Sequence, residues 1–447
     1  MPIENTCGTG AQRSSPAAAA VDTTKLMEKI PDEILEKIFM MIAFDAAVGL
    51  SHIFLPLNTN PKGVLALMLV CQKWHRIAEQ ILYRRIEYMG KPPITSERAG
   101  SLPHLLDRKP YLSNYIRELS IYGPWEIYDD VVLKILPYCK RLRLLHLDGE
   151  LSAPPSAVPT VIKNLPLKSL SITTVESSLL ADGFFNFLIG LRYLENLKIG
   201  LWAPPYPITD MKRLPADSRG QSNIKILQIE ETNTYPTLTE DCLALPAALE
   251  EVLLTGLGFS RSSWYYSPDQ IQALLLLHRD SLLRIQLSGI RILNQDPTLG
   301  PLPSFTLFPR LEQLFLCAYQ VFSKEKPTGL YHKLSAPNLK LLILHFDYAD
   351  THHLGAEDFG EAHINWLEEF ASVHSQTSLA ENFCELHIMF RPLIEDSEDF
   401  SWPWDRLDRA AEIVSKHGIK LTYSERTCSR AEWEAMAAEE EAIRRGC

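Results

Sequence analysis

Histidine and carboxylate side chains, which could hold a metal ion, gather in one stretch of the sequence. The stretch holds three histidines and four acidic residues: His352, His353, His363, Asp347, Asp350, Glu357 and Asp358. A zinc site on a helix needs its histidines on the same face of that helix, as in H-E-x-x-H. The adjacent histidines His352 and His353 point in different directions. We therefore interpret the stretch as a solvated acidic loop and predict no metal and no other cofactor.

Residues that could catalyse a reaction form no known pattern. Gly256-Leu257-Gly258 lacks the third glycine and the Lys-Ser/Thr pair of a phosphate-binding loop, and no G-x-S-x-G elbow occurs. The eight cysteines include no C-x-x-C pair and lie far apart, unlike those of a zinc site or a disulfide framework. No catalytic residue is predicted, an enzyme has the least support, and the cysteines favour the cytoplasm or the nucleus.

The composition is that of an acidic, globular chain. Apolar residues make up 46% of the 447 residues and charged residues 22%, as in soluble folded proteins. The formal charge is −11, with 13 basic and 11 acidic side chains in residues 1–110 and 31 and 44 in residues 111–447. An acidic body repels phosphate backbones, so we expect no nucleic-acid partner. No stretch has the roughly 20 consecutive apolar residues, free of charged residues, that a membrane-spanning helix needs.

Two helical patterns stand near the start of the chain, after a polar and alanine-rich leader at 1–24. In the first, apolar side chains recur at i, i+4, i+5, i+8 and i+9: Ile30, Ile34, Leu35, Ile38 and Phe39. Pro31 and the two acidic residues after it suit a first helical turn. A loop-like stretch at 49–63 leads to the second pattern, which runs from residue 64 to residue 82.

From residue 116 onward the string apolar-x-x-apolar-x-apolar repeats. Its ten copies have the middle residues Leu119, Leu145, Leu170, Leu197, Leu227, Val252, Ile285, Leu314, Leu342 and Leu386. Most of their spacings, 26, 25, 27, 30, 25, 33, 29, 28 and 44 residues, lie near the 20–29 of a leucine-rich repeat. Each copy predicts a short strand with alternate side chains pointing inward. Such units bury their apolar faces only by stacking, which predicts an α/β solenoid.

Two half-motifs within residues 30–88 stand in the order of a known domain family. The first is an aliphatic-Pro pair and an acidic, apolar helix, Ile30-Pro31-Asp32-Glu33-Ile34-Leu35-Glu36-Lys37-Ile38-Phe39. The second is an L-x-L-V-C-x-x-W string, Leu67-Met68-Leu69-Val70-Cys71-Gln72-Lys73-Trp74, followed by Tyr83. These half-motifs resemble an F-box. With its repeats, the whole chain is similar to the F-box and leucine-rich-repeat proteins that are abundant in fungi.

The chain departs from the family pattern at two places. The link between the half-motifs, about residues 47–62, is longer than usual, so we expect a loop insertion between the first two helices. The repeats lack the Asn or Cys that the leucine-rich consensus places after the third apolar position. Their turns must then satisfy backbone polar groups in another way, and we expect an irregular array.

The resemblance and the repeats predict five segments. These are a disordered leader at 1–24, a three-helix F-box module at 25–88, a linker-helix region at 89–115, an irregular leucine-rich-repeat α/β solenoid (a horseshoe) at 116–424, and a charged helix at 425–447. Residues 419–423 could add a last strand, and we interpret the C-terminal part as a cap over the solenoid end.

The resemblance also implies partners. An F-box docks on the adaptor Skp1, and through it on a cullin of a ubiquitin ligase, while the repeats hold a protein substrate. The residues expected to face Skp1 are Ile30, Pro31, Ile34, Leu35, Ile38, Leu67, Val70, Cys71 and Trp74. The alternative for some of them is that they only pack the F-box helices together.

Strand geometry predicts which side chains point away from the solenoid core. Those of the early repeats are mostly polar: Ser120, Tyr122, His146, Asp148, Ser171, Thr173, Lys198, Gln228 and Glu230. Later repeats have a more apolar set, where we expect the substrate: Leu253, Phe315, Ile343, His345 and Met389. Alternatively, the acidic segment with Trp402 and Trp404 folds over this patch, or the register is shifted by one residue.

Two functions remain open. The first is the substrate-recognition subunit of an Skp1–cullin–F-box ubiquitin ligase, which does no chemistry itself. The alternative is a leucine-rich scaffold whose F-box binds Skp1 without degradation, or whose N-terminal helices only cap the solenoid. The cap hypothesis predicts that residues 26–88 cannot be detached without unfolding the array. The receptor hypothesis predicts a mobile module with an apolar face that fits a partner.

Overall fold

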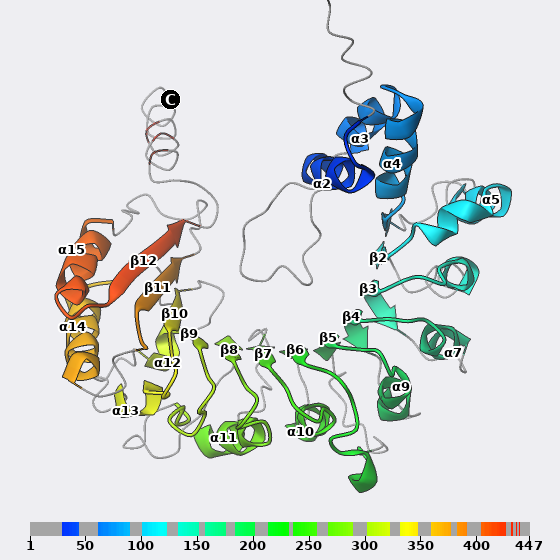
Figure 1. The fold of residues 1–447 in the computed structure, drawn as a ribbon. Helices are drawn as coiled ribbons and strands as arrows, with labels where there is room; N and C mark the ends of the chain where they lie inside the picture. Colours follow the sequence, from blue (N-terminus) through cyan, green and yellow to red (C-terminus); the bar gives the residue numbers. More distant parts are fainter. Residues whose placement is uncertain are drawn as a thin grey trace, which may run out of the picture. The chain divides into compact units, whose positions relative to one another are not determined.

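The computed structural model of the chain forms two units, Met1–Arg84 and Arg85–Cys447 (Figure 1). The structure describes residues 29–43, 61–89, 101–122, 133–151, 157–175, 184–201, 213–231, 236–256, 267–288, 302–321, 331–346, 359–376, 382–390 and 404–425, with the single residues 431, 435 and 438. No helix in these ranges is both long and apolar enough to cross a membrane.

The first unit is a module of three helices with a core of its own. Its helices are α2 (Asp32–Ala43), α3 (Pro61–Met68) and α4 (Gln72–Leu82). Two acidic residues open α2 and a proline opens α3, as suits the first turn of a helix. All three helices contribute to the core: Leu35, Phe39, Ala43, Val64, Ile77, Ala78 and Ile81. The predicted three-helix module is confirmed, and most of its expected loop insertion lies outside the described residues.

The second unit is built on one sheet of twelve strands, all parallel and paired in chain order. The strands are β1 (Arg85–Met89), β2 (Glu118–Tyr122), β3 (Leu144–Leu151), β4 (Ser169–Val175), β5 (Asn196–Leu201), β6 (Ile226–Glu231), β7 (Glu251–Gly256), β8 (Arg284–Ser288), β9 (Gln313–Cys317), β10 (Leu341–Phe346), β11 (Glu385–Phe390) and β12 (Lys420–Glu425). The ten predicted repeats are β2 to β11, so the predicted α/β solenoid is confirmed. The sheet starts one strand earlier than the repeat pattern predicts. This first strand, β1, pairs with β2 and overlaps the end of the segment 25–88 that was predicted to be the F-box module.

Helices lie on one face of this sheet (Figure 1). They are α5 (Ser101–Arg108), α7 (Ala157–Lys163), α9 (Phe184–Gly190), α10 (Pro236–Ala244), α11 (Pro268–Leu276), α12 (Ala318–Val321), α13 (Tyr331–Leu334), α14 (Glu361–Gln376) and α15 (Trp404–Ser415). Three short 3-10 helices supplement them: η1 (Pro110–Asn114), η2 (Leu136–Tyr138) and η3 (Ala216–Ser218). The other face of the sheet carries no helix among the described residues.

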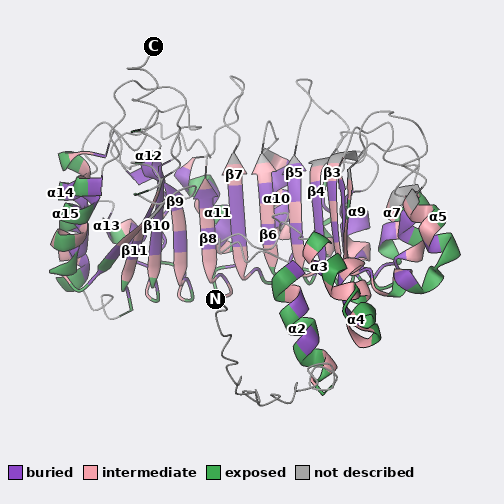
Figure 2. Cartoon of the chain, turned by 90° about the horizontal axis from the view of Figure 1, so that it is seen from above, coloured by how far each residue is buried: buried purple, intermediate pink, exposed green. Residues whose placement is uncertain are grey.

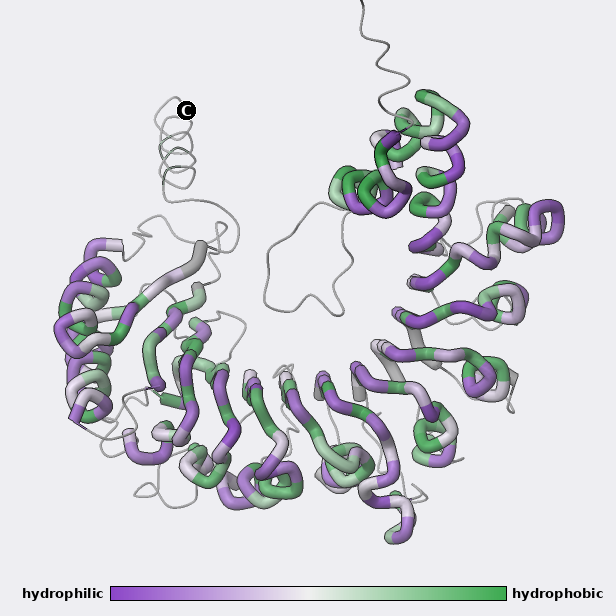
Figure 3. Tube along the Cα trace, viewed as in Figure 1, coloured by the Kyte–Doolittle hydropathy of each residue, from purple (hydrophilic) through white to green (hydrophobic). Residues whose placement is uncertain are grey.

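The three apolar positions of every repeat form the core between the sheet and the helices. In the repeat that contains β2 these positions are Ile116, Leu119 and Ile121, each at most 1% exposed, and the equivalent side chains of the other nine repeats are also buried. Figure 2 shows the buried residues along the strands, and Figure 3 shows apolar and polar residues alternating there. A strand and a helix cannot bury these side chains alone, so each repeat depends on its neighbours.

A continuous backbone ladder joins the repeats at the residue before each strand. The carbonyl oxygen of Arg117 accepts hydrogen bonds from two successive amides of the next repeat, those of Arg143 and Leu144, at 2.8 and 3.0 Å. The same double acceptance recurs, at 2.7–3.3 Å, at Arg143, Lys168, Glu195, Lys225, Glu250, Leu283, Glu312 and Lys340. These carbonyls satisfy two backbone amides of each following repeat at the start of its strand. Most of the turns after the strands, where the consensus Asn or Cys would stand, lie outside the described residues.

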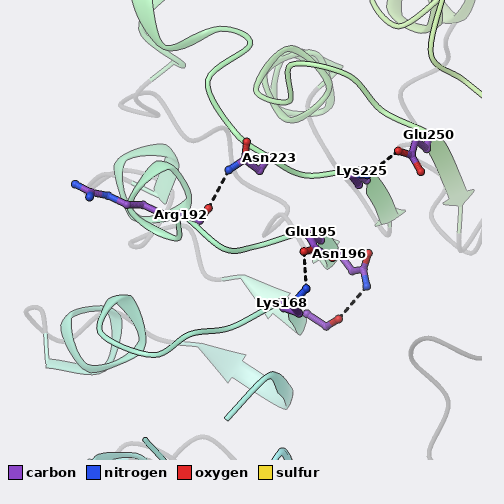
Figure 4. A network of polar contacts seen from close by, with 8 residues as sticks. Lys168, Arg192, Glu195, Asn196, Asn223, Lys225 and Glu250 are labelled. Atoms are coloured by element: carbon purple, nitrogen blue, oxygen red, sulfur yellow. Dashed lines mark hydrogen bonds and ion pairs between the residues drawn. The ribbon is translucent and has the colours of Figure 1, made fainter. Parts of the chain in front are cut away.

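Side chains at the same positions pair across neighbouring repeats. Lys168 Nζ lies 2.7 Å from Glu195 Oε1, and Lys225 Nζ lies 2.9 Å from Glu250 Oε1 (Figure 4). Asn223 adds a hydrogen bond of 3.0 Å from its side-chain amide to the carbonyl oxygen of Arg192. Exposed ion pairs of this kind contribute little each, about 0.2–1 kcal/mol, so the backbone ladder dominates the alignment of the repeats.

Gly200 in β5 is expected to tolerate no side chain. A Cβ atom there would lie 1.7 Å from the carbonyl oxygen of Thr173 in β4, far inside contact distance. We expect Gly200→Ala to lower the free energy of unfolding by about 2–3 kcal/mol in urea denaturation, because the backbone of the two strands must shift. Gly190→Ala is the control, since its Cβ would meet only the flexible side chain of Lys163. An equal loss in both variants would contradict this.

His374 in α14 is expected to make stability depend on pH. Its ring lies 4.4 Å from that of Phe370 and 4.9 Å from that of Phe383, and burial lowers the pKa of its imidazole from 6.5 to about 4. The unfolded chain thus binds a proton near pH 6.5 that the folded chain binds only near pH 4. Stability therefore falls as the pH falls through this window. We expect His374→Leu to reduce that loss by about 2–3 kcal/mol in urea titrations.

The control for this measurement is His332→Leu, because His332 is exposed on α13. It should leave the dependence of the unfolding free energy on pH as it is in the unmodified protein. If His374→Leu also left the pH dependence of the unfolding free energy unchanged, burial of the His374 imidazole would not be the cause of the loss of stability in acid.

Candidate functional site

The first unit exposes an apolar surface. Seven of the eleven large apolar side chains that are exposed in the described part of the chain belong to this small unit: Ile34, Ile38, Met41, Ile42, Leu65, Leu69 and Val70. Met41 is 78% and Leu69 87% exposed. We call these seven residues the helical face. A concentration of exposed apolar side chains is typical of an interaction site, because contact between apolar surface and water is unfavourable.

Helix geometry explains how the same helices fill the core and form the helical face. In α2 every fourth residue from Leu35 is buried, while Ile34 and the residues four and eight positions after it are exposed. The same division occurs in α3, where Val64 is buried and Leu65 is exposed, as is Leu69 one turn later. Both helices are therefore apolar on two sides, and only one side meets the core.

The structure divides the nine residues predicted to face Skp1 into three groups. Exposed are Pro31, Ile34, Ile38 and Val70; partly buried are Ile30, Leu67, Cys71 and Trp74. Of the partly buried residues, Ile30, Leu67 and Trp74 pack against the core of the unit. Leu35 is 1% exposed and belongs to the core, because it lies about 100° around α2 from Ile34.

Four residues of the helical face were missed in the sequence analysis: Met41, Ile42, Leu65 and Leu69. The signal for two of them is present, because Ile42 continues the spacing of four that starts at Ile34, and Leu69 follows Leu65 by four. An apolar helix with two such series has more apolar surface than its own small core can cover.

Polar contacts hold α2 and α4 together beside the helical face. Asp32 accepts a hydrogen bond from the Arg76 guanidinium and pairs with Lys73, whose Nζ lies 3.1 Å from Asp32 Oδ1. Lys73 Nζ also donates to the carbonyl oxygen of Ile30, at 2.5 Å. The ring of Trp74 meets that of Phe39 edge-on, with centroids 5.0 Å apart. The start of α2 is thereby fixed on α4, and Trp74 has an internal role in packing.

The second candidate surface is the open face of the sheet, which we define as the side chains on the sheet face away from the helices. The register places them in rows across the strands. One row contains Glu87, Ser120, His146, Ser171, Lys198, Gln228, Leu253, Gln286, Phe315, Ile343, His387 and Thr422. In the next row Tyr122 pairs with Asp148, Glu230 with Thr255, and His345 with Cys317 on one side and Met389 on the other. The observed register excludes the alternative of a shift by one residue.

The five residues predicted to hold the substrate all lie on the open face, but they differ in exposure. Leu253, Ile343 and His345 are only 8%, 4% and 5% exposed. Phe315 and Met389 are half-buried. The sequence could not show this difference, because the packing of such side chains depends on their neighbours in other strands. Trp404, which the alternative placed over the patch, is buried at the start of α15, and Trp402 lies outside the described residues.

Charged groups of the two central rows of the open face are concentrated in its first half. Lys198 Nζ lies 2.6 Å from Glu230 Oε1, and Arg85 Nη2 lies 3.1 Å from Glu87 Oε1. His146 Nδ1 is 2.8 Å from Ser171 Oγ, and burial lowers the pKa of the His146 imidazole against the opposing effect of Asp148. This histidine is therefore neutral at neutral pH.

The described residues contain no group of three or more His, Cys, Asp or Glu side chains arranged to hold a metal ion. Residues 347–358 of the histidine-rich stretch lie outside the described residues. His363 is described; its ring stacks on that of Phe359 at 5.6 Å, and its Nδ1 accepts a hydrogen bond of 3.1 Å from the amide of Gly360. His363 therefore stabilises the first turn of α14.

Comparison with known proteins bears on the first unit. Residues 27–88 match the F-box-like family, and this range includes α2, α3, α4 and the helical face. No curated protein matches the chain. The chain therefore carries an F-box-like domain at residues 27–88, which is followed by a long solenoid of parallel β/α repeats consistent with leucine-rich repeats.

Proposed function

We propose that this protein is the substrate-recognition subunit of an Skp1–cullin–F-box ubiquitin ligase. The observation that carries the proposal is the helical face, which lies within the residues that match the F-box-like family. F-box proteins are typically non-catalytic adaptors, and the proposed role requires no reaction at the protein itself. By holding a substrate in the same complex as the ubiquitin-charged enzyme, the chain would raise the effective concentration of that substrate. This role belongs in the cytoplasm or the nucleus.

The helical face has the chemistry that the docking of an adaptor needs. Its residues project from two helices and the turn between α3 and α4, so a single partner surface can cover them. Complete burial of one such side chain stabilises a complex by about 1.5–3 kcal/mol before the costs of association. We assign Ile34, Ile38, Leu69 and Val70 to the Skp1 contact, and we leave Leu35 to the core.

The separate core of the first unit supports the receptor hypothesis over the cap hypothesis. Its core residues come from the unit's own three helices, and the chain divides at residue 84. A module that buries its own apolar side chains does not need the solenoid for its folding, whereas a cap would. The scaffold alternative, in which Skp1 is bound without degradation, shares this surface and differs only in the fate of the protein held by the repeats.

Ile34 and Leu35 form a matched pair for a test of this surface. We expect Ile34→Ala to weaken Skp1 binding about tenfold in titration calorimetry while changing the free energy of unfolding by less than about 0.5 kcal/mol. Leu35→Ala removes a buried side chain and should lower that free energy by about 2–5 kcal/mol. If Ile34→Ala destabilised the module as much as Leu35→Ala, the helical face would belong to the folding core and not to a partner.

Charge placed on the helical face should abolish the complex. We expect the double variant Ile38→Asp, Leu69→Asp to lose capture of Skp1 and cullin in a pull-down, because two carboxylates would be desolvated in the contact. The matched control is Leu277→Asp, which adds a charge at an exposed apolar residue of the second unit and should retain capture. Circular dichroism shows whether each variant is folded. Capture by the folded double variant would refute the assignment.

A further inference from the structure

The open face of the sheet consists of two halves with different chemistry. In the first half, on β1 to β6, the two central rows hold charged or ionisable side chains: Glu87, Tyr122, His146, Asp148, Lys198 and Glu230. The row before them, at the strand starts, carries charges in both halves: Arg85 and Glu118 in the first, and Glu251, Arg284 and Glu385 in the second. In the second half, the two central rows of β7 to β11 hold no charged residue: Leu253, Thr255, Gln286, Ser288, Phe315, Cys317, Ile343, His345, His387 and Met389.

Asp148 is the acidic residue of the two central rows that has no ion-pair partner among the described residues. The two cations of this half, Arg85 and Lys198, pair with Glu87 and Glu230. Among the described residues no cation lies within ion-pair distance of Asp148, and the neighbouring His146 is neutral. Tyr122 is the register partner of Asp148 in β2, so an aromatic ring stands beside the carboxylate. A carboxylate next to an aromatic ring suits a lysine or arginine side chain of a partner.

Phe315 and Met389 offer an apolar contact in the second half. Both are half-buried, so part of each side chain remains open to a partner. Beside them in the same rows lie Ile343, the register partner of Phe315, and His345, the register partner of Met389; both are buried, and the ring of His345 is 5.5 Å from that of Phe315. Packed support of this kind holds an aromatic side chain in place, which favours tight apolar contacts.

The position of the two contacts sets the length of a partner that reaches both. Asp148 is on β3 and Phe315 on β9, six strand spacings along the sheet. At about 4.8 Å per spacing this path is roughly 29 Å, which about nine extended residues or about nineteen helical residues would cover.

We propose that the open face binds a substrate segment with a lysine or arginine at one end and large apolar side chains at the other, the basic end on Asp148 and the apolar end on Phe315 and Met389. This proposal rests on the proposed function as a substrate receptor and names the class of substrate. The balance of −13 over residues 111–447 favours such a basic segment over an acidic one.

The same chemistry disfavours a phosphorylated segment. Recognition of phosphate needs unpaired arginine or lysine side chains. In the described part of the open face Arg85 and Lys198 are already paired with carboxylates, as are Arg284 with Glu251 at 3.0 Å and Lys420 with Glu385 at 3.8 Å. A phosphate near Asp148 would also meet a negative charge. The substrate segment is therefore bound without phosphorylation.

A selection from random peptides tests the proposal. The full chain, immobilised through an N-terminal tag, is exposed to a phage-displayed library of random 16-residue peptides, and the bound peptides are sequenced. We expect an excess of peptides that combine Lys or Arg with Leu, Ile, Met or Phe. Asp148→Lys should reverse the charge preference, and Phe315→Ser or Met389→Ser should remove the apolar preference. An excess of acidic peptides, or preferences that all three variants leave intact, would overturn the proposal.

Matched controls and a synthetic peptide complete the test. Asp280→Lys and Tyr193→Ser change an exposed acid and an exposed aromatic residue elsewhere in the second unit, and they should keep both preferences. A selected peptide synthesised with phosphoserine beside its basic residue should bind at least tenfold more weakly in fluorescence anisotropy, and tighter binding would overturn the proposal. Skp1 capture by the same preparation is measured separately, so failure of the proposed function and failure of this inference are distinguished.

Discussion

The backbone ladder before each strand is the constraint on which the second unit depends. At each step one carbonyl oxygen accepts two successive amides of the next repeat, from Arg117 as far as Lys340. The ladder uses no side chain, so it accepts arginine, lysine, glutamate and leucine equally well at the accepting position. It fixes the register of each strand against the last and thereby sends the apolar triplets to the helix side. Without this register, the side chains of the open face would not fall into rows.

The first unit obeys a different rule, because its helices have more apolar surface than its core can hold. In α2 the series from Leu35 and the series from Ile34 are equally apolar, and only the first is buried. A side chain such as Leu69, left 87% exposed, adds nothing to the stability of the isolated module. Its burial becomes favourable only in a complex. A module of this kind is therefore shaped for association, and its apolar excess is the physical counterpart of its match to the F-box-like family.

The sequence predicted the solenoid well because three buried positions per repeat recur with a regular spacing. It missed β1, where the string runs Tyr83, Ile86 and Tyr88 and tyrosine takes the place of leucine. Within the F-box-like domain it identified the right helices but not the direction of each side chain. Leu35 and Ile34 are both aliphatic neighbours, and only the position of α4 decides which of them is buried. For the same reason the deep burial of Ile343 could not be read from its own strand.

A backbone-based ladder also explains how one sheet can carry two chemistries on its open face. Since alignment needs only carbonyls, amides and the buried triplets, the outward side chains are free to differ from repeat to repeat. The first repeats pair their charges, as Lys198 does with Glu230, and leave Asp148 available. The later repeats pack Phe315 against the ring of His345. A rigid array of this kind presents both groups at a fixed separation, so a partner that fits both gains from the second contact without a further cost of association.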